Sequence, residues 1–283
     1  MKKPVLLIAF FAVLSLNAFA DQTPKDKWAK FGDVKIHFYD IGRSNKKDAL
    51  ILVHGWNCNA DFWKESFNAF PNYRVVAIDL PGSGQSDKPK VEYSMEYFAR
   101  SIDAVMRQAK IERAVLVGHS MGTPVIRQFY RIFPQKTLGL VIVDGALKPF
   151  APRPQMEQFL APLRANYKEG SAKFVDDMLT PIQNAELKTR IRTTMLAAPE
   201  YVGLGAWDGM IDDRIWIDDQ IKVPTLAILA AGPWPADIET TYRTVAPDLE
   251  FQMWSGVSHF LMMERPKEFN AAVAKFLVNK RLL

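Results

Sequence analysis

The chain has 283 residues, of which 48% are hydrophobic and 24% are charged, and its formal net charge is +5 at pH 7. This composition is that of an ordinary globular protein and excludes a disordered, collagen-like or low-complexity chain. Basic residues are scattered rather than gathered in dense runs, which argues against a nucleic-acid-binding protein. Because Cys58 is the single cysteine, we expect a fold held by its hydrophobic core without an internal disulfide.

The first twenty residues have the pattern of a bacterial export signal. Lys2 and Lys3 precede an almost unbroken apolar run, Val5–Leu16, and small residues occupy the two positions of segment 18–20 that a signal peptidase reads. The apolar run is too short for a transmembrane anchor, and a retained N-terminal anchor is the alternative interpretation. We predict cleavage after Ala20, a mature chain without a stable membrane anchor, and a periplasmic or secreted location.

The mature chain would have about 263 residues and a net charge of +3, and this length fits one large α/β domain or two small ones. Short apolar runs alternate with segments of helical periodicity, which is typical of a mostly parallel sheet covered by helices on both faces. The predicted strands are Trp28–Phe31, which has the weakest pattern, Val34–Asp40, Ala49–His54, Arg74–Asp79, Ala114–His119, Leu138–Asp144, Thr225–Ala230 and Leu249–Trp254. The predicted helices include Tyr93–Ala109, Met121–Ile132 and Pro266–Val278.

One interval, residues 147–220, lacks strand-like runs and contains only amphipathic helical patterns. It is too rich in Phe, Leu and Trp for a linker, so we predict a helical cap inserted into a core formed by residues 21–146 and 221–283. The predicted helices of this cap are Met156–Tyr167, Ser171–Leu179, Ala185–Leu196 and Tyr201–Ile211.

The segment GHSMG, residues 118–122, follows a predicted strand and precedes a predicted helix. In this context the pattern G-x-S-x-G presents a serine nucleophile above a sheet. The flanking glycines allow a tight turn without Cβ clashes, and the helix N-terminus directs backbone N–H groups to the same point. We therefore predict that Ser120 is a nucleophile, and a tight structural turn is the alternative.

A serine nucleophile needs a base, and the chain has four histidines. His37 lies within an early strand, where packing is the expected role, and His54 ends a strand, where we expect it to orient a loop. The side chain of His119 is expected to point away from Ser120 on the turn. His259 follows the last strand and fits the chain order Ser, acid, His. We predict that His259 is the base, and a surface loop histidine is the alternative.

Two backbone N–H groups are needed to hold the negatively charged oxygen of a tetrahedral intermediate. The amide of Met121, directly after the predicted nucleophile, is one candidate. The second is the amide of Trp56, in the loop after Ala49–His54, where Gly55 lets the backbone approach closely. The indole ring of Trp56 is also expected to wall the pocket; simple core packing is the alternative, and the two are compatible.

With these motifs in chain order, the sequence resembles the α/β-hydrolase fold superfamily, in its small cap-bearing branch of esterases, lactonases, C–C hydrolases and cofactor-free perhydrolases. The resemblance implies an eight-stranded, mostly parallel sheet and a Ser-His-Asp hydrolase. It argues against epoxide hydrolases and haloalkane dehalogenases, which have Asp where this chain has Ser120. The segments that carry the resemblance span nearly the whole mature chain and are LVHGWNCNADFW, VVAIDLPGSGQSDKP, AVLVGHSMGT, LVIVDGA and GVSHFLMMERPKEFNAAVAKFL.

The sequence departs from that branch at the third catalytic group. Most relatives carry the acid in a Gly-x-x-Asp segment after the seventh strand, but here residues 231–233 are Ala, Gly and Pro. Asp144 ends the sixth strand, where some branches carry the acid, and it is the preferred candidate to orient His259. Asp237 is the alternative acid, although an Asp there is also an ordinary helix N-cap. A dyad, or an acid not identified here, is the third possibility.

The resemblance also bears on two further carboxylates and on the pocket. Asp79 and Asp87 flank the LPGSGQS loop, which is structural in the family, so neither is assigned chemistry. The pocket should be apolar and aromatic, with most of the bulky cap residues packed inside the cap rather than against a ligand. These cap residues are Phe150, Phe159, Tyr167, Met178, Met195, Tyr201, Trp207 and Trp216, and the core residues expected nearby are Trp56, Trp234, Phe260 and Met262.

These observations favour a secreted serine hydrolase that cleaves a carboxylester or lactone of a small apolar substrate through an acyl-enzyme. The sequence has no phosphate-binding loop, dinucleotide fingerprint or metal-spaced cluster of His, Cys and Asp, so we expect no cofactor and no metal. The alternative is a binding or signalling protein that keeps the fold to hold a small apolar ligand, since the usual acid is missing. The oligomeric state is left open.

Overall fold

The computed structural model describes residues 24–43 and 45–283, so the predicted export signal, residues 1–20, lies outside the described residues. The described strands form one sheet in the order β1-β2-β4-β3-β5-β6-β7-β8. β2 pairs antiparallel with both β1 and β4, and the remaining neighbours in the sheet are parallel. The strands are β1 (Lys25–Phe31), β2 (Val34–Gly42), β3 (Asp48–Val53), β4 (Arg74–Ile78), β5 (Arg113–His119), β6 (Thr137–Val143), β7 (Thr225–Ala230) and β8 (Leu249–Trp254).

The strands β3 to β7 are the ones whose sequence is almost continuously apolar. Their residues are nearly all buried, because helices cover the sheet from both sides. The edge strand β1 is mostly exposed, and it begins at Lys25, three residues before the predicted Trp28. The polar residues Lys25–Lys27 belong to the sheet because their backbone pairs with β2, although their side chains do not show the apolar pattern of a buried strand. The predicted mostly parallel sheet of eight strands is confirmed.

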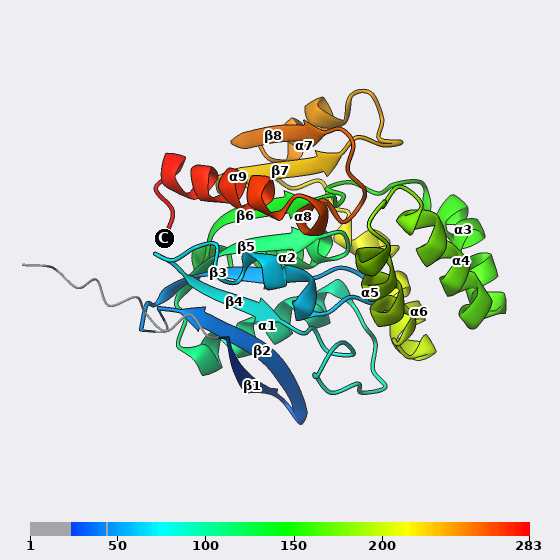
Figure 1. Ribbon diagram of the computed structural model, residues 1–283, viewed down its shortest axis with the longest axis horizontal. Helices are drawn as coiled ribbons and strands as arrows, with labels where there is room; N and C mark the ends of the chain where they lie inside the picture. The colour runs from blue at the N-terminus through cyan, green and yellow to red at the C-terminus, as the bar shows by residue number, and fades with distance from the viewer. Residues whose placement is uncertain (1–23, 44) are drawn as a thin grey trace, which may run out of the picture.

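The helices of the core lie on both faces of the sheet (Figure 1). In this view α1 and α2 lie behind the sheet, and α8 and α9 lie in front of it. The helix predicted to start at Asp237 is observed as α7, whereas the sequence pattern does not predict α8 or the 3-10 helix 60–66, because these two are too short to show a clear helical period. These core helices are α1 (Met95–Ala109), α2 (Gly122–Ile132), α7 (Ile238–Val245), α8 (Leu261–Glu264) and α9 (Pro266–Asn279).

Four helices follow β6 and precede β7, and they stand together beyond the carboxyl ends of the strands (Figure 1). We refer to residues 147–220, which contain them, as the insertion. The side chains of Asn166 and Asn184 accept hydrogen bonds from backbone amides in the first turns of α4 and α5, which begins those helices. The helices of the insertion are α3 (Arg153–Ala165), α4 (Tyr167–Leu179), α5 (Ala185–Leu196) and α6 (Glu200–Met210).

Two arginines of α2 hold the two ends of the insertion. Arg127 is buried and donates hydrogen bonds to Leu147 O at 2.6 Å and to Ile217 O at 3.1 Å, where the chain leaves and re-enters the core. Arg127 and Arg131 also share the carboxylate of Asp219, with N–O distances of 2.6 Å. Because bonds between a guanidinium and a carboxylate are strong and directional, both crossings are fixed to α2.

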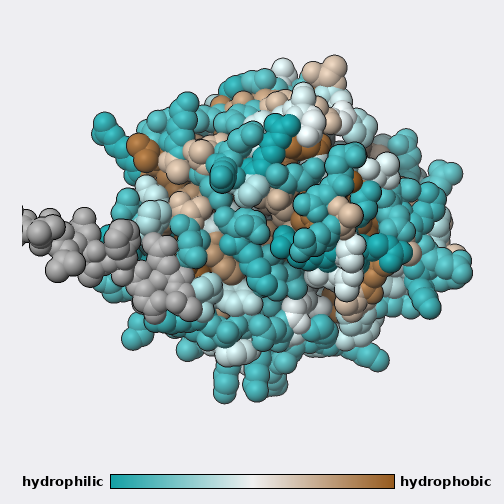
Figure 2. Space-filling view, in the orientation of Figure 1, coloured by the Kyte–Doolittle hydropathy of each residue, from teal (hydrophilic) through white to brown (hydrophobic). Residues whose placement is uncertain are grey.

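The surface in the same orientation is mainly hydrophilic, with small and separate hydrophobic areas (Figure 2). Exposed large apolar side chains include Phe150, Phe159 and Ile217 of the insertion and Val278 of α9. Scattered apolar residues of this kind are normal on a globular surface. In the part of the chain that the structure describes, none of the helices combines the length and the hydrophobicity needed to cross a membrane.

Candidate active site

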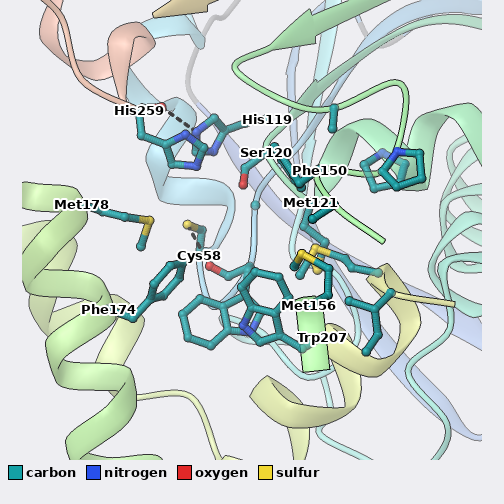
Figure 3. A pocket seen from close by; sticks show the side chains of 18 of the residues that line it. Cys58, His119, Ser120, Met121, Phe150, Met156, Phe174, Met178, Trp207 and His259 are labelled. Atoms are coloured by element: carbon teal, nitrogen blue, oxygen red, sulfur yellow. Dashed lines mark hydrogen bonds between the residues drawn. The ribbon is translucent and has the colours of Figure 1, made fainter. Parts of the chain in front are cut away.

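Segment 118–122 forms a sharp turn between β5 and α2. Ser120 has a φ of +52°, in the left-handed region that is strained for a residue with a Cβ. Its amide donates a hydrogen bond to Val143 O at 2.9 Å, so the neighbouring strand holds the turn. A Cβ at Gly118 would collide with the carbonyl oxygen of Gly122, which explains the glycine at that position. The turn directs the Ser120 side chain into a cavity (Figure 3).

His259 lies on the loop after β8, and its ring lines the same cavity. Its Nδ1–H donates a hydrogen bond to Asp144 Oδ2 at 2.6 Å, because a carboxylate can only accept. Asp144 directly follows β6, is buried and has a φ of +43°. Its other oxygen, Oδ1, accepts a hydrogen bond from Ala230 N at 2.8 Å. The carboxylate is thus held by β7, and Nε2 is left as the basic nitrogen of His259.

The Ser120 hydroxyl and His259 Nε2 are not joined by a hydrogen bond in the described part of the chain, although both side chains line the cavity. Contacts between a nucleophile and its base often shorten only when the substrate binds. The arrangement therefore places a serine and an oriented imidazole on the wall of one cavity, with the Asp144 carboxylate hydrogen-bonded to that imidazole.

The two candidates for the acid that orients His259, Asp144 and Asp237, lie in different surroundings. Asp237 is exposed at the N-cap of α7, and its side chain makes no capping hydrogen bond. Residues 231–233, directly after β7, are exposed as well. Asp144, the candidate that the sequence favours, is the carboxylate in contact with His259.

Asp79 and Asp87 hold the chain rather than face the cavity. Asp79 accepts hydrogen bonds from Ala60 N at 2.7 Å and from the buried His37 Nδ1 at 2.8 Å. Asp87 accepts a hydrogen bond from Lys35 N at 2.7 Å. These contacts tie the loop after β4 to β2, which is the structural role that the sequence resemblance implies for both carboxylates.

His54 orients the loop after β3, as expected from its position. Its Nδ1–H donates to Gly55 O at 2.8 Å, and its Nε2 accepts from Leu80 N at 3.0 Å. Burial lowers the pKa of His54 below its ordinary value of 6.5, so the ring is neutral at physiological pH. Both ring nitrogens are occupied by backbone groups, so His54 is not available as a base.

His119 is the histidine next to Ser120 in the chain. Its side chain lines the cavity, and its Nε2–H donates a hydrogen bond to His259 O at 2.8 Å. The sequence predicts only that this side chain points away from Ser120; its place on the cavity wall was not predicted, because the left-handed turn at Ser120 interrupts the alternation of side chains that a regular strand would have. Burial, and then the neighbouring His259, lower the pKa of His119 well below 6.5, so it is neutral.

The loop after β3 packs directly on the turn at Ser120. A Cβ at position 55 would lie 3.0 Å from Ser120 Cβ and 3.0 Å from His119 Nδ1, so the glycine allows this close approach. Gly55, Trp56 and Met121 all line the cavity. The backbone segments that carry the two predicted oxyanion donors, Trp56 and Met121, therefore border the space into which Ser120 projects.

The cavity has a volume of about 150 Å³ and lies between the core and the insertion. His259 and His119 stand on one side of it, and Phe174 and Trp207 stand on the opposite side (Figure 3). Trp56, Phe174 and Trp207 form an aromatic triangle with ring centroids 5.6 to 6.0 Å apart. The methionines that line the cavity are Met121, Met156, Met178, Met195 and Met210.

The cavity uses more of the insertion than the sequence suggests. The prediction that most of the bulky insertion residues pack away from a ligand is wrong, because helical periodicity shows which face of a helix is buried but not where a cavity opens within it. Those that line the cavity are Phe150, Met178, Met195, Trp207 and Trp216, whereas Phe159, Tyr167 and Tyr201 do not. Of the core residues named in advance, Trp56 and Phe260 line it and Trp234 and Met262 do not.

Cys58 is a cavity residue that the sequence did not single out. Its thiol donates a weak hydrogen bond to Trp56 O at 3.3 Å, and burial raises the pKa of Cys58, so the group stays protonated. Over residues 24–43 and 45–283, no group of three or more His, Cys, Asp and Glu side chains is arranged to hold a metal ion.

The comparison with known proteins starts from the segment that contains the serine turn. Residues 48–181 match a family model described as the alpha/beta hydrolase fold. The chain has the α/β-hydrolase fold. This α/β-hydrolase is 28% identical, over 267 residues, to 2-hydroxy-6-oxononadienedioate/2-hydroxy-6-oxononatrienedioate hydrolase of Paraburkholderia phymatum, which corresponds to 87% of this chain and 91% of that protein.

Solved structures give the same fold. A thermophilic esterase is 26% identical to this α/β-hydrolase, with a TM-score of 0.73 over 91% of this chain and 98% of that one. Est816, described as an N-acyl homoserine lactone degrading enzyme, is 23% identical, with a TM-score of 0.75 over 88% of this chain and 100% of that one.

The α/β-hydrolase fold explains why the candidate residues meet. Ser120 follows β5, Asp144 follows β6, Trp56 lies in the loop after β3, and His259 lies in the loop after β8. These strands are parallel, so their carboxyl ends share one edge of the sheet, where ligands of open α/β sheets bind. Residues far apart in the sequence thereby meet: Trp56, Ser120 and His259 line one cavity, and Asp144 contacts His259.

Proposed function

We propose that this α/β-hydrolase is a serine hydrolase that cleaves carboxylic esters or lactones of small apolar acids through an acyl-enzyme. The observation that carries the proposal is the contact of His259 Nδ1 with Asp144 Oδ2 at 2.6 Å, beside the cavity into which Ser120 projects. An imidazole that donates Nδ1–H to a buried carboxylate has a fixed tautomer with a basic Nε2, as the removal of a serine proton requires.

The first half of the reaction forms the acyl-enzyme. His259 Nε2 removes the proton of the Ser120 hydroxyl as Oγ attacks the carbonyl carbon of the substrate. The resulting oxyanion accepts hydrogen bonds from the backbone amides of Met121 and Trp56. Asp144 stabilises the imidazolium that has formed. When the tetrahedral intermediate collapses, His259 gives its proton to the leaving oxygen, and the alcohol departs or, in a lactone, the ring opens.

The second half releases the acid. A water molecule gives a proton to His259 Nε2 and attacks the acyl carbon, and the same two amides hold the new oxyanion. The bond to Ser120 Oγ then breaks, and His259 returns the proton to Oγ. The free carboxylic acid leaves and the enzyme is restored, so no oxidant, reductant or cofactor enters the balance.

The walls of the cavity favour an acyl group that is small and apolar or aromatic. A volume of about 150 Å³ is the size of cavity that holds benzene. The aromatic triangle of Trp56, Phe174 and Trp207 offers edge-to-face contacts to a ring. The surrounding methionines adapt to groups of different shape. The solved relatives described as an esterase and a lactone-degrading enzyme support this choice of bond.

The proposal is tested with the purified mature protein on a panel of p-nitrophenyl esters and lactones. Phenylacetyl and short-chain acyl groups should be cleaved faster than long-chain ones. Because Arg153 lies on the cavity wall, one panel member should carry a terminal carboxylate. Ser120→Ala should abolish turnover, and activity that survives this change would refute the mechanism.

A binding or signalling protein with the same fold is the second candidate, and the enclosed apolar cavity is the observation in its favour. The two functions differ in the reactivity of Ser120. Rapid labelling of Ser120 by a fluorophosphonate probe indicates an activated nucleophile and supports the enzyme. Absence of labelling, together with tight binding of an apolar ligand, supports the binding protein. The carboxylate at His259 favours the enzyme, because it supplies the group that the sequence lacks after β7.

We also propose that the enzyme is exported, on the basis of the sequence of residues 1–20 alone. Expression of the full chain in a bacterial host and mass spectrometry of the periplasmic fraction test this. The expected product begins at Asp21. A chain found only in the cytoplasm with an intact N-terminus would contradict export.

A further inference from the structure

His119 is a buried histidine at the centre of the site that the proposed reaction does not use. It precedes Ser120 in the chain, is 1% exposed and lines the cavity. Among the residues that the structure describes it has no carboxylate partner, in contrast to His259 and His37. A buried imidazole in this position that takes no part in the proposed acid–base steps should have another role in the site.

The first contact of His119 is with the loop of the proposed base. Its Nε2–H donates to the backbone carbonyl oxygen of His259 at 2.8 Å. The two imidazole rings also lie against each other, with centroids 4.7 Å apart and planes inclined by 46°. Figure 3 shows this hydrogen bond and the two rings side by side at the edge of the cavity. Both the backbone and the ring of His259 are therefore in contact with His119.

The second contact is with the loop that carries the Trp56 amide. A Cβ at Gly55 would lie 3.0 Å from His119 Nδ1, so the backbone of this loop packs against the ring. His119 Nδ1 is buried and has no hydrogen-bond partner among the described residues. The rings of Trp63 and His119 also form a T-shaped pair, with centroids 6.4 Å apart. His119 is thus in contact with two segments that each supply one part of the proposed machinery, the loop of His259 and the loop of Trp56, and it is the chain neighbour of Ser120.

We propose that His119 is a positioning residue that sets the orientation of His259 relative to Ser120. This inference rests on the proposed function of the same site. Because His119 is the chain neighbour of Ser120, its hydrogen bond to the His259 carbonyl ties the base to the nucleophile through one rigid ring. The Asp144 contact fixes the tautomer of His259 and one point of its ring; the carbonyl contact fixes the backbone from which that ring extends.

The effect expected from losing this contact follows from geometry. Without the Nε2–H donor, the His259 carbonyl oxygen loses this hydrogen bond, and the loop is free to move toward another donor. A displacement of about 1 Å between a base and its nucleophile lowers turnover by about 100-fold. Substrate binding in the cavity depends on the aromatic and methionine side chains instead, so kcat should fall while KM changes little.

Three variants separate the donor from the ring. His119→Phe keeps an aromatic ring and loses the donor. His119→Gln loses the ring and keeps a donor, because its Nε2 is as many bonds from Cα as the imidazole Nε2. His119→Asn carries its amide only as far as the Nδ1 position and serves as the matched control for His119→Gln. Each is measured for kcat and KM on one p-nitrophenyl ester, for the rate of fluorophosphonate labelling, and for its thermal unfolding midpoint.

We expect His119→Phe to lower kcat and the labelling rate together by about 10- to 100-fold, with KM within about 3-fold of the unsubstituted enzyme. His119→Gln should restore kcat to within about 5-fold, and His119→Asn should be as slow as His119→Phe. The acid limb of the pH–rate profile should stay in place in all three, because a neutral His119 is not the group that titrates.

Two results would overturn the inference. One is a folded His119→Phe with unchanged kcat, and the other is a folded His119→Gln that is as slow as His119→Asn. If His119→Phe does not fold, the comparison of the Gln and Asn variants decides alone. Ser120→Ala is measured in the same assay. If it remains active, the proposed function fails; if it is inactive while His119→Phe is normal, only the inference on His119 fails.

Discussion

The core and the insertion contribute to the cavity in different ways. In the core, the residues proposed for chemistry are held by the main chain. Ser120 and Asp144 both have positive φ values, and their backbone amides donate hydrogen bonds to Val143 O and Ile228 O of neighbouring strands. In the insertion, the cavity is lined mainly by methionine and aromatic side chains that are held by packing. The difference suggests that the core fixes where a bond is broken, and that the insertion decides which acyl group reaches that point.

The two regions are nevertheless linked at the loop after β3. Trp56 Nε1–H donates to Gly203 O of α6 at 2.8 Å, and Asn57 Nδ2 donates to the Tyr167 hydroxyl of α4 at 2.8 Å. The loop that carries a proposed oxyanion donor is therefore held by the insertion from above. Substitutions in the core and in the insertion can show how far the division of tasks holds.

The largest effect is expected in the core. Asp144→Asn should lower kcat by about 10²- to 10⁴-fold, because it removes the charge that stabilises the His259 imidazolium and permits the wrong tautomer. Asp237→Asn is the matched control and should leave kcat within about 2-fold, because this residue is exposed on α7. Steady-state kinetics on a p-nitrophenyl ester measure both. A loss caused by Asp237→Asn rather than Asp144→Asn would assign the acid to the other residue.

A smaller and different effect is expected in the insertion. Trp207→Ala enlarges the cavity, so KM for a phenylacetyl ester should rise by about 10-fold with kcat within about 3-fold. The kcat/KM for a longer acyl chain should rise at the same time. Phe159→Ala is the control, because Phe159 makes an edge-to-face contact with Trp207, with centroids 5.8 Å apart, but does not line the cavity. If Trp207→Ala lowers kcat as strongly as Asp144→Asn, the division between the two regions is wrong.

The smallest effect concerns the stability of the core. Burial alone would lower the pKa of His37, but its bonds to Asp79 and Asp26, at 2.8 and 2.9 Å, raise the pKa above 6.5. The stability from this cluster is therefore fully present below pH 6.5 and is lost as the pH rises through the raised pKa. Urea unfolding between pH 6 and 9 should show the stability difference between the unsubstituted enzyme and His37→Gln shrinking as the pH rises. A constant difference would mean that His37 does not titrate in this range.

The sequence predicted best the elements whose residue pattern follows from burial alone. The strands β3 to β7 are apolar because both of their faces are covered, and β7 is observed with the predicted bounds, Thr225–Ala230. At the edge of the sheet, Lys25–Lys27 pair with β2 while their side chains are exposed or half-exposed, so the pattern of a buried strand is absent there. The 3-10 helix 60–66 was missed because its seven residues make only about two turns, too few to show a periodicity.

The parts of the candidate site that a motif and the order of residues along the chain determine could be predicted from the sequence. Ser120 and His259 follow from a motif and from elimination among four histidines. The choice between Asp144 and Asp237 depended on which strand end lies beside His259, and that is a property of the assembled sheet. The position of His119 was missed for a related reason, because a turn with positive φ changes the direction of the preceding side chain in a way that strand alternation does not describe.

The hydrogen bonds of Arg127 have a practical consequence for redesign. One guanidinium reaches both Leu147 O and Ile217 O, so the two points at which the insertion joins the core lie side by side. A segment whose two ends are close together is the kind that tolerates replacement as a unit. Residues 148–216 can therefore be treated as an exchangeable cassette, to be grafted from a relative with a different substrate while α2 and its two arginines keep the junction closed.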